Sequence, residues 1–271
     1  MVTLEQLQAG IVLPIDKPRQ WTSFQAVNKI KAVVRNTYGL QKFQIGHAGT
    51  LDPLATGLLL VCLGKATKSI PQLQDGDKVY TGTLVLGATT PCYDLERAID
   101  AYYPYEHITP ELLKETTRQF TGTIMQVPPM FSAVKIDGQR AYEYARTDDP
   151  TVTIQPKPVT VYSFEITDFR PGRASSTSTA SPSSPASISS ISSSSRNLYK
   201  APQGVIPEHL PQADFRICCG KGTYIRSLAR DLGAALGSGA FLSALRREQI
   251  GNYSVDRALQ LDQVEAYLKA L

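Results

Sequence analysis

The stretch GHAGTLDPLATG occupies residues 46–57 and leads directly into the apolar run LLLVCL at residues 58–63. A single acid, Asp52, lies among its glycines, which allow backbone angles that other residues avoid. Pro53 favours an extended conformation at Asp52 and removes one backbone donor beside it. The pattern predicts a loop that fixes a carboxylate and then feeds a buried strand. Two roles fit that carboxylate, a catalytic group or the cap of a tight turn, because Asp before Pro is common in turns.

The composition is that of a globular protein. The chain has 271 residues, 42% of them apolar, which is enough for one large domain or two small ones. A net charge of +4 and a pI of about 8.8 fit a nucleic-acid partner, but they also fit many other proteins. No apolar run is long enough to span a membrane. The four cysteines include no Cys-x-x-Cys pair, so we expect free thiols and a cytoplasmic location.

Hydrophobic periodicity predicts both strands and helices along the chain. Strands are expected at residues 10–15, 58–63, 78–87, 134–140, 159–169 and 214–219, and helices at 22–38, 65–74, 109–120, 227–236 and 261–271. Thr3 with Gln6, and Thr22 with Gln25, have the spacing of a capping box at a helix start. The helix at 22–38 has an apolar face and a basic face. The apolar face carries Phe24, Val27, Ile30 and Val34. The basic face carries Lys29, Lys31 and Arg35.

One segment has a very different composition. Residues 174–195 contain 13 serines in 22 positions and no aromatic side chain. Such a segment has too little to bury to repay the entropy of ordering it. Because strands are predicted on both sides, we interpret residues 171–200 as a flexible insertion within one domain.

The motif at residues 46–57 closely resembles the central motif of the TruB family of tRNA pseudouridine synthases. The likeness runs from about Ile11 to about Val255, interrupted by the Ser-rich insertion. Residues 86–94, which include Asp94, match the family only loosely. Four other segments match in the expected order: the Lys-Pro motif at Asp16-Lys17-Pro18, the base-stacking tyrosine segment at Lys78-Val79-Tyr80, the arginine motif at residues 220–226, and a pocket segment at Leu245-Arg246-Arg247.

The resemblance implies isomerisation of a uridine in the T arm of tRNA, at position 55. The base is cut from its sugar and rejoined through carbon. Asp52 would be the essential carboxylate, which either adds to the base or the ribose or abstracts a ribose proton; the sequence does not choose among these. An aspartate is ionised at neutral pH and needs no separate base to activate it.

The resemblance also implies roles for other side chains. Arg226 would pair with Asp52 and keep it charged inside a closed pocket. Tyr80 would stack on the extracted uracil, and His47 would take the space of that base or orient it. Lys17, Tyr224 and Leu245 would line or buttress the substrate pocket. From residue type alone, each of these side chains could equally serve packing or surface solvation.

Residues 125–146 resemble the RNA-gripping insertion of the family, whose basic side chains would bind phosphates. A solvated charged face is the alternative interpretation. The candidate RNA-binding residues are Lys135, Arg140, Arg146, Lys65 and Lys68.

We therefore expect an α/β fold of the α+β type, in which a mixed, largely antiparallel sheet is flanked by helices and carries the site in a central cleft. Residues 1–271 would form a single catalytic domain with insertions at 125–146 and 171–200. Little more than one helix follows Arg247, which leaves no room for the PUA-type RNA-binding domain common in the family. We expect a monomer with tRNA as its partner, and no guide RNA, obligate protein partner, membrane contact, cofactor or metal.

Three rival interpretations remain. A glycosidase would need a second acid near Asp52, and the motif contains none. A nucleotide-binding loop would end in Gly-Lys-Ser or Gly-Lys-Thr and precede a helix. A non-catalytic protein that unfolds and refolds tRNA fits better than these two. The joint presence of Asp52, Tyr80 and Arg226 favours the enzyme, for which tRNA folding would be a secondary role.

Overall fold

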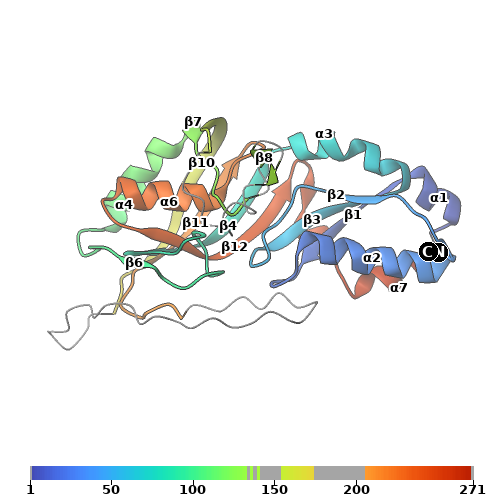
Figure 1. Cartoon of the computed structure of the whole chain (residues 1–271), viewed down its shortest axis with the longest axis horizontal. Coiled ribbons are helices and arrows are strands. Elements are labelled where there is room, and N and C mark those ends of the chain that lie inside the picture. Colours follow the sequence, from blue (N-terminus) through green and yellow to red (C-terminus); the bar gives the residue numbers. More distant parts are fainter. Residues whose placement is uncertain (1, 133–134, 137–138, 141–153, 174–204, 270–271) are drawn as a thin grey trace.

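A computed structural model describes residues 2–132, 135–136, 139–140, 154–173 and 205–269. The molecule is elongated, and one sheet extends through both of its halves (Figure 1). Within the described residues this sheet has ten strands in the order β14-β1-β3-β12-β4-β11-β10-β7, with β2 added at β3 and β13 at β12. Its strands are β1 (Ile11–Lys17), β2 (Ile45–Ala48), β3 (Thr56–Leu63), β4 (Lys78–Leu86), β7 (Gly122–Gln126), β10 (Lys157–Arg170), β11 (Gln212–Cys219), β12 (Ala240–Ile250), β13 (Tyr253–Ser254) and β14 (Leu259–Gln260).

The sheet is mixed and largely antiparallel, as the resemblance implied. Among the described pairings, β1 with β14 and β3 with β12 are parallel, and the others in this sheet are antiparallel. In the described ranges, two short antiparallel strand pairs lie outside it, β5 (Ala88–Thr89) with β6 (Ala101–Tyr102) and β8 (Lys135–Ile136) with β9 (Gln139–Arg140). The α+β prediction is therefore confirmed.

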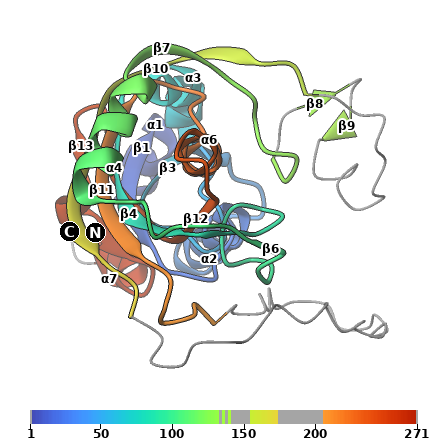
Figure 2. The same ribbon diagram turned by 90° about the vertical axis from the view of Figure 1, so that its left-hand side faces the viewer.

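Helices cover both halves of the sheet (Figures 1 and 2). In one half α6 packs against β12 and α4 against β10, and in the other α2 packs against α7 and β2. No helix in the described ranges has the length and apolar character to cross a bilayer. The helices are α1 (Leu4–Ala9), α2 (Ser23–Tyr38), α3 (Ile70–Asp75), α4 (Pro110–Thr117), α6 (Ile225–Ala235) and α7 (Gln263–Lys269), with short 3₁₀ turns η1 (Gly64–Ser69), η2 (Arg118–Phe120) and η3 (Val255–Arg257).

Helix α2 begins and ends where the sequence predicts. The Thr22 hydroxyl accepts the Gln25 N–H, the Gln25 side chain accepts the Thr22 N–H, and Gly39 ends the helix with φ 66°. The other apolar residues of the predicted face are buried, but Phe24 is 70% exposed. Phe24, in the first turn of α2, lines an open hollow.

The motif at residues 46–57 is not entirely a loop. Its first three residues belong to β2, which pairs antiparallel with β3, so that His47 lies opposite Val61. The loop proper consists of residues 49–55, called here the Asp52 loop. The strand after it is buried from Gly57 to Leu63, as predicted.

Other boundaries differ from the prediction by a few residues. The helix expected at 65–74 is divided between η1 and α3, and α6 begins at Ile225, so Arg226 lies in its first turn. The strand and turn expected at 134–140 correspond to the β8–β9 hairpin. Residues 141–146 of the insertion at 125–146 and residues 174–200 of the Ser-rich insertion lie outside the described residues.

Gly57 allows the parallel contact of β3 with β12. Its φ is +100°, and a Cβ there would lie 2.3 Å from the Arg247 carbonyl oxygen. Because only glycine tolerates both the angle and the approach, this residue lets β12 run beside the strand that follows the Asp52 loop. The parallel pair brings together Asp52 and a chain segment nearly two hundred residues later.

Candidate active site

The Asp52 loop is tied to the rest of the chain on both sides of the acid. Ser23, at the start of α2, accepts the Leu51 N–H at 2.9 Å through its Oγ and donates that hydroxyl to the Leu51 carbonyl at 3.2 Å. On the other side, the Pro53 carbonyl accepts the Gln20 N–H at 2.8 Å. These bonds fix the backbone of both neighbours of Asp52, and with it the direction of the carboxylate.

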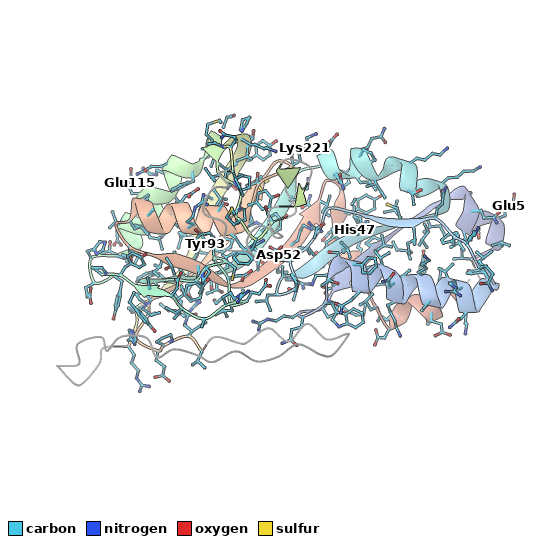
Figure 3. All side chains as sticks on the ribbon, in the orientation of Figure 1. Glu5, His47, Asp52, Tyr93, Glu115 and Lys221 are labelled. Carbon is cyan, nitrogen blue, oxygen red and sulfur yellow. The ribbon has the colours of Figure 1, made fainter. Side chains whose placement is uncertain are left out.

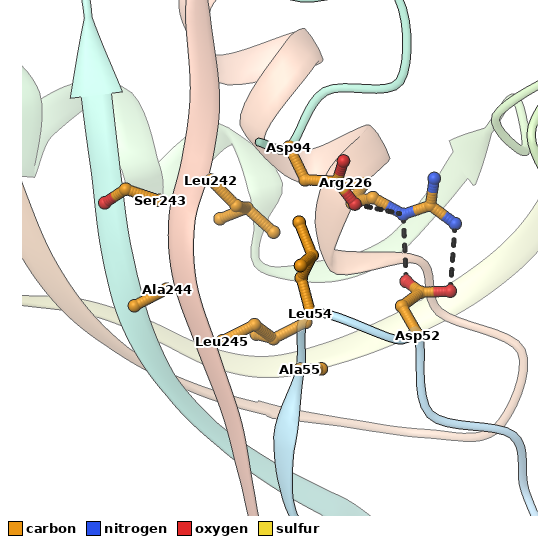
Figure 4. A pocket seen from close by; sticks show the side chains of 9 residues that line it. All are labelled: Asp52, Leu54, Ala55, Asp94, Arg226, Leu242, Ser243, Ala244 and Leu245. Carbon is orange, nitrogen blue, oxygen red and sulfur yellow. Dashed lines mark hydrogen bonds and ion pairs between the residues drawn. The ribbon is translucent and has the colours of Figure 1, made fainter. Parts of the chain in front are cut away.

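The Asp52 carboxylate faces the guanidinium of Arg226 (Figure 4). Arg226 Nε lies 2.9 Å from Oδ2, and Nη2 donates to Oδ1 at 3.1 Å. The Arg226 side chain is 5% exposed and that of Asp52 is 36% exposed, so the cation is inside and the acid reaches open space. Burial alone lowers the pKa of Arg226, but Asp52 and Asp94 raise it above its ordinary value. The guanidinium therefore stays charged and holds the acid by two contacts.

Asp94 lies on the other side of the same guanidinium. Its Oδ2 is 3.8 Å from Arg226 Nε, and burial raises the pKa of Asp94 although Arg226 opposes that shift. The carbonyls of Cys92 and Phe131 accept hydrogen bonds from Arg226 at 3.2 and 2.9 Å. Two carboxylates and two carbonyls therefore fix the guanidinium. The loosely matching segment at residues 86–94 thus contributes directly to the site.

A hollow of about 720 Å³ opens in front of the ion pair. Tyr80 from β4, Leu245 from β12 and Tyr224 from the loop before α6 line it together with Asp52 and Arg226. Its volume lies within the range of roughly 300–1,000 Å³ typical of sites that bury a small organic group. The apolar wall beside the ion pair, which Figure 4 shows, consists of Leu54, Ala55, Leu242 and Leu245.

Tyr80 and Leu245 come from neighbouring strands. Leu245 lies opposite Gly82 and Arg247 opposite Tyr80, so Tyr80 and Leu245 are diagonal neighbours across the β4–β12 pair. Burial raises the pKa of Tyr80, while the charge of Arg247 lowers it in part. Tyr80 is thus a neutral phenol at neutral pH, and its ring forms part of an apolar wall beside the charged pair.

Two family models match the chain in agreement with this site. TruB family pseudouridylate synthase (N terminal domain) matches residues 35–184, and tRNA pseudouridylate synthase B C-terminal domain matches residues 226–270. The chain belongs to the TruB family of pseudouridylate synthases.

Relatives in this family match nearly the whole chain. The tRNA pseudouridine synthase B of Flavobacterium johnsoniae is 46% identical over 269 residues, which are 99% of this chain and 100% of that protein. The protein of the same name from Thermobifida fusca is 42% identical over 95% of this chain and 74% of its own length. A chain from the crystal structure of a Cbf5–Nop10–Gar1 complex is 25% identical with a TM-score of 0.60; the match covers 96% of this chain and 55% of that chain, about half its length.

In this pseudouridylate synthase, His47 lies on the opposite side of the Asp52 loop from Tyr80. Figure 3 shows His47 on β2, in the half of the molecule that contains α2. It lines a second hollow of about 410 Å³, and among the described residues it does not line the hollow that contains Tyr80. Burial lowers the pKa of His47, and the charge of Arg247 lowers it further, so the imidazole is neutral at neutral pH. The two side chains that the resemblance assigns to the target base are separated by the acid.

Lys17 supports the synthase loop from behind. It is fully buried at the end of β1, and its Nζ donates to the carbonyls of Trp21 at 2.6 Å, Pro18 at 3.0 Å and Pro53 at 3.4 Å. Burial lowers its pKa to about 8, although Asp52 raises it. Among the described residues it lines none of the three hollows beside Asp52. Its contacts therefore lie behind the Asp52 loop and not in a hollow.

Arg247 belongs to the site, although the motifs give it no specific role. It is 2% exposed, and its guanidinium donates to the carbonyls of Leu58 at 2.8 Å, Gly49 at 3.0 Å and Thr50 at 3.5 Å. One side chain thus joins the start of the Asp52 loop to the strand that follows it. A signal was present in the sequence, because adjacent arginines on a strand point to opposite faces and one of them must point inward.

The predicted RNA-binding residues are only partly placed. Lys65 and Lys68 are on η1, and both are exposed. Lys135 and Arg140 lie in the β8–β9 hairpin, but their side chains lie outside the described part of the chain, as does the whole of Arg146.

Proposed function

We propose that this pseudouridylate synthase acts on the uridine at position 55 in the T arm of tRNA, and that Asp52 supplies the carboxylate on which the reaction depends. One observation supports this proposal above the others. A half-buried acid, held by two contacts from a buried arginine, lies at the mouth of a hollow that is walled by Tyr80 and Leu245. The arrangement suits chemistry on a planar base brought into the hollow.

The target base has to leave its stack before Asp52 can approach the glycosidic bond. Extrusion costs a few kcal/mol, and stacking of a base on an aromatic ring returns roughly 1–3 kcal/mol. The ring of Tyr80 therefore offsets much of the cost of extrusion. Leu245, its diagonal neighbour on the same face of the sheet, extends this apolar wall of the hollow.

Arg226 orients Asp52 in this proposal, and Asp94 orients Arg226. Its guanidinium is also bound at Cys92 and Phe131, and these contacts fix the edge that Arg226 presents to Asp52. The acid can then act on the base or the ribose without first reorganising its surroundings. Asp52 thus cuts and rejoins the base from a fixed position.

The experiment that tests the proposal is incubation of the purified chain with unmodified tRNA, followed by mapping of pseudouridine. We expect a single product at position 55. A product at another position would support the reaction but show that the enzyme acts at a different uridine. Absence of product from any tRNA would overturn the proposed function.

We further propose that the enzyme works as a cytoplasmic monomer without guide RNA or partner protein. The four cysteines, all present as thiols, are compatible with a reducing compartment. Turnover of naked tRNA by the purified chain, at a rate per subunit that does not change with protein concentration, is the expected result. Restoration of activity only by an added RNA or protein would contradict it.

A further inference from the structure

The hollow on the His47 side of the Asp52 loop has no role in the chemistry described above. It measures about 410 Å³ and shares Thr50, Leu51 and Asp52 with the hollow that contains Tyr80. The Asp52 loop is therefore a ridge with an open space on each side. RNA whose target base lies on one side of this ridge has to continue past it.

An exposed aromatic ring lines this second hollow. Phe24 is 70% exposed, whereas Tyr80 in the first hollow is 8% exposed. Isolated exposed apolar residues are common on protein surfaces. Phe24 differs because it lines a concave space together with His47 and the proposed catalytic Asp52.

The position of Phe24 relative to Asp52 is fixed by the backbone. Its neighbour Ser23 exchanges two hydrogen bonds with Leu51, the residue before Asp52. The capping box of Thr22 and Gln25 holds the first turn of α2 on either side of the ring. The ring is therefore carried by a rigid helix end that is bonded to the Asp52 loop.

A positive charge lies next in sequence to the backbone contact at this hollow. Arg19 is exposed and precedes Gln20, whose N–H donates to the carbonyl of Pro53, one of the residues that line the hollow. A nucleotide presents a flat base together with an anionic phosphate, and single-stranded RNA is bound by aromatic rings and basic side chains in combination. The charge and the ring therefore fit a nucleotide.

We propose that this second hollow, the Phe24 subsite, holds the base of a nucleotide joined directly to the target uridine, and that Phe24 stacks on that base. The inference rests on the proposed function, because it requires a target base in the Tyr80 hollow. The target base would then lie on one side of the Asp52 loop and the neighbouring base on the other, with the RNA backbone passing over Asp52. The subsite thus helps to keep the target unstacked from its neighbour.

The test uses the full chain and a T-arm stem-loop RNA in which the nucleotide on the 5′ or the 3′ side of the target is made abasic. RNA affinity and single-turnover pseudouridine formation are measured for the wild type, Phe24→Ala and Phe24→Trp. Tyr102→Ala is the matched control, because Tyr102 is 60% exposed on β6 and lines none of the three hollows beside Asp52. Phe24 is exposed, so its replacement leaves the fold intact.

We expect Phe24→Ala to weaken RNA binding about 5- to 150-fold, the range for loss of one stacked base, and Phe24→Trp to restore it. Removing the base from one of the two neighbouring nucleotides should weaken binding of the RNA to the wild type by a similar factor. The same abasic RNA should bind to Phe24→Ala no more weakly than the intact RNA does. Tyr102→Ala should bind like the wild type. The proposed subsite would be overturned if wild type and Phe24→Ala bound RNA with equal affinity. It would also be overturned if the affinity loss from Phe24→Ala added to the loss from an abasic nucleotide at either neighbouring position. Absence of pseudouridine with the wild type would instead overturn the proposed function, so the two failures are distinguishable.

Discussion

Arg226 holds both carboxylate oxygens of Asp52, with Nε 2.9 Å from Oδ2 and Nη2 3.1 Å from Oδ1. The two residues are 174 positions apart in the sequence. Helix α6 presents the arginine from one half of the molecule, and the Asp52 loop presents the acid from the other. The site therefore depends on how the two halves of the sheet join, and residues that support this junction should affect catalysis through the position of Asp52.

Arg247→Lys tests such a supporting residue. A lysine cannot satisfy three carbonyls in the plane of a guanidinium, so the Asp52 loop should shift relative to β3. We expect kcat to fall about 100-fold, which is the order expected when a reacting group is misplaced by about 1 Å, while tRNA affinity is retained. Single-turnover kinetics and filter binding separate the two quantities.

Arg246→Lys is the control for this change. Arg246 is the preceding residue of β12, but its guanidinium binds the Asp16 carboxylate at 2.9 and 3.0 Å. We expect kcat near that of the wild type. Equal losses in the two variants, or no loss at Arg247→Lys, would show that the contacts to the loop carbonyls do not position Asp52.

Lys17 makes the stability of the protein depend on pH. Its pKa is 10.5 as a free group and about 8 in the fold, so the unfolded chain binds more protons between these values. Stability should therefore rise as the pH increases from about 8 to 10.5, with a gain of about 3 kcal/mol from this group. Below pH 8 Lys17 is charged in both the folded and the unfolded state, so its destabilising effect should no longer change with pH.

Urea unfolding of wild type and Lys17→Met across this pH range checks that prediction. Other lysines and tyrosines titrate equally in both proteins, so the difference between the two curves isolates Lys17. A difference that does not change between pH 8 and 10.5 would mean that the fold does not depress the pKa of Lys17.

Much of this architecture can be predicted from the sequence, because it is determined by local patterns. A capping box and a C-terminal glycine delimit α2, and a continuous apolar run predicts β3 as a buried strand. The motif around Asp52 identifies the acid through the resemblance. In each case neighbouring residues contain the whole signal.

The remaining features depend on contacts between distant segments. The inward direction of Arg247 depends on the register between β12 and β3, and the exposure of Phe24 depends on the hollow between α2 and the Asp52 loop. Lys17 turns behind the loop because three carbonyls converge there. Periodicity contains none of this information, since it reports which face of an element is apolar and not what that face meets.

Gly57→Ala should show the cost of the β3–β12 contact. The strained backbone angle alone costs roughly 1–3 kcal/mol, and the methyl group would also collide with the Arg247 carbonyl. Gly39→Ala is the matched control, because Gly39 has φ +66° and a methyl group there would meet no atom within 4 Å. Denaturant melts should show the larger loss of unfolding free energy at Gly57. Similar losses at both positions would leave only the backbone angle as the cause.

Basic residues of the 125–146 insertion are predicted to bind phosphates. Replacing Lys135, Arg140 and Arg146 together by glutamine should weaken tRNA binding and reduce the slope of log affinity against log salt by about 2 to 3, close to one unit for each lost phosphate contact. Lys114→Gln, on α4, is a control for loss of an exposed charge elsewhere. An unchanged salt slope in the triple variant would contradict the prediction.

The most direct test of the central claim is pseudouridine formation by Asp52→Asn. Asparagine keeps the size of the side chain and removes its charge. We predict that the variant folds and binds tRNA with wild-type affinity but forms no pseudouridine, even in single-turnover reactions with excess enzyme. Pseudouridine formation by Asp52→Asn at the wild-type rate would contradict the assignment of Asp52 as the essential carboxylate.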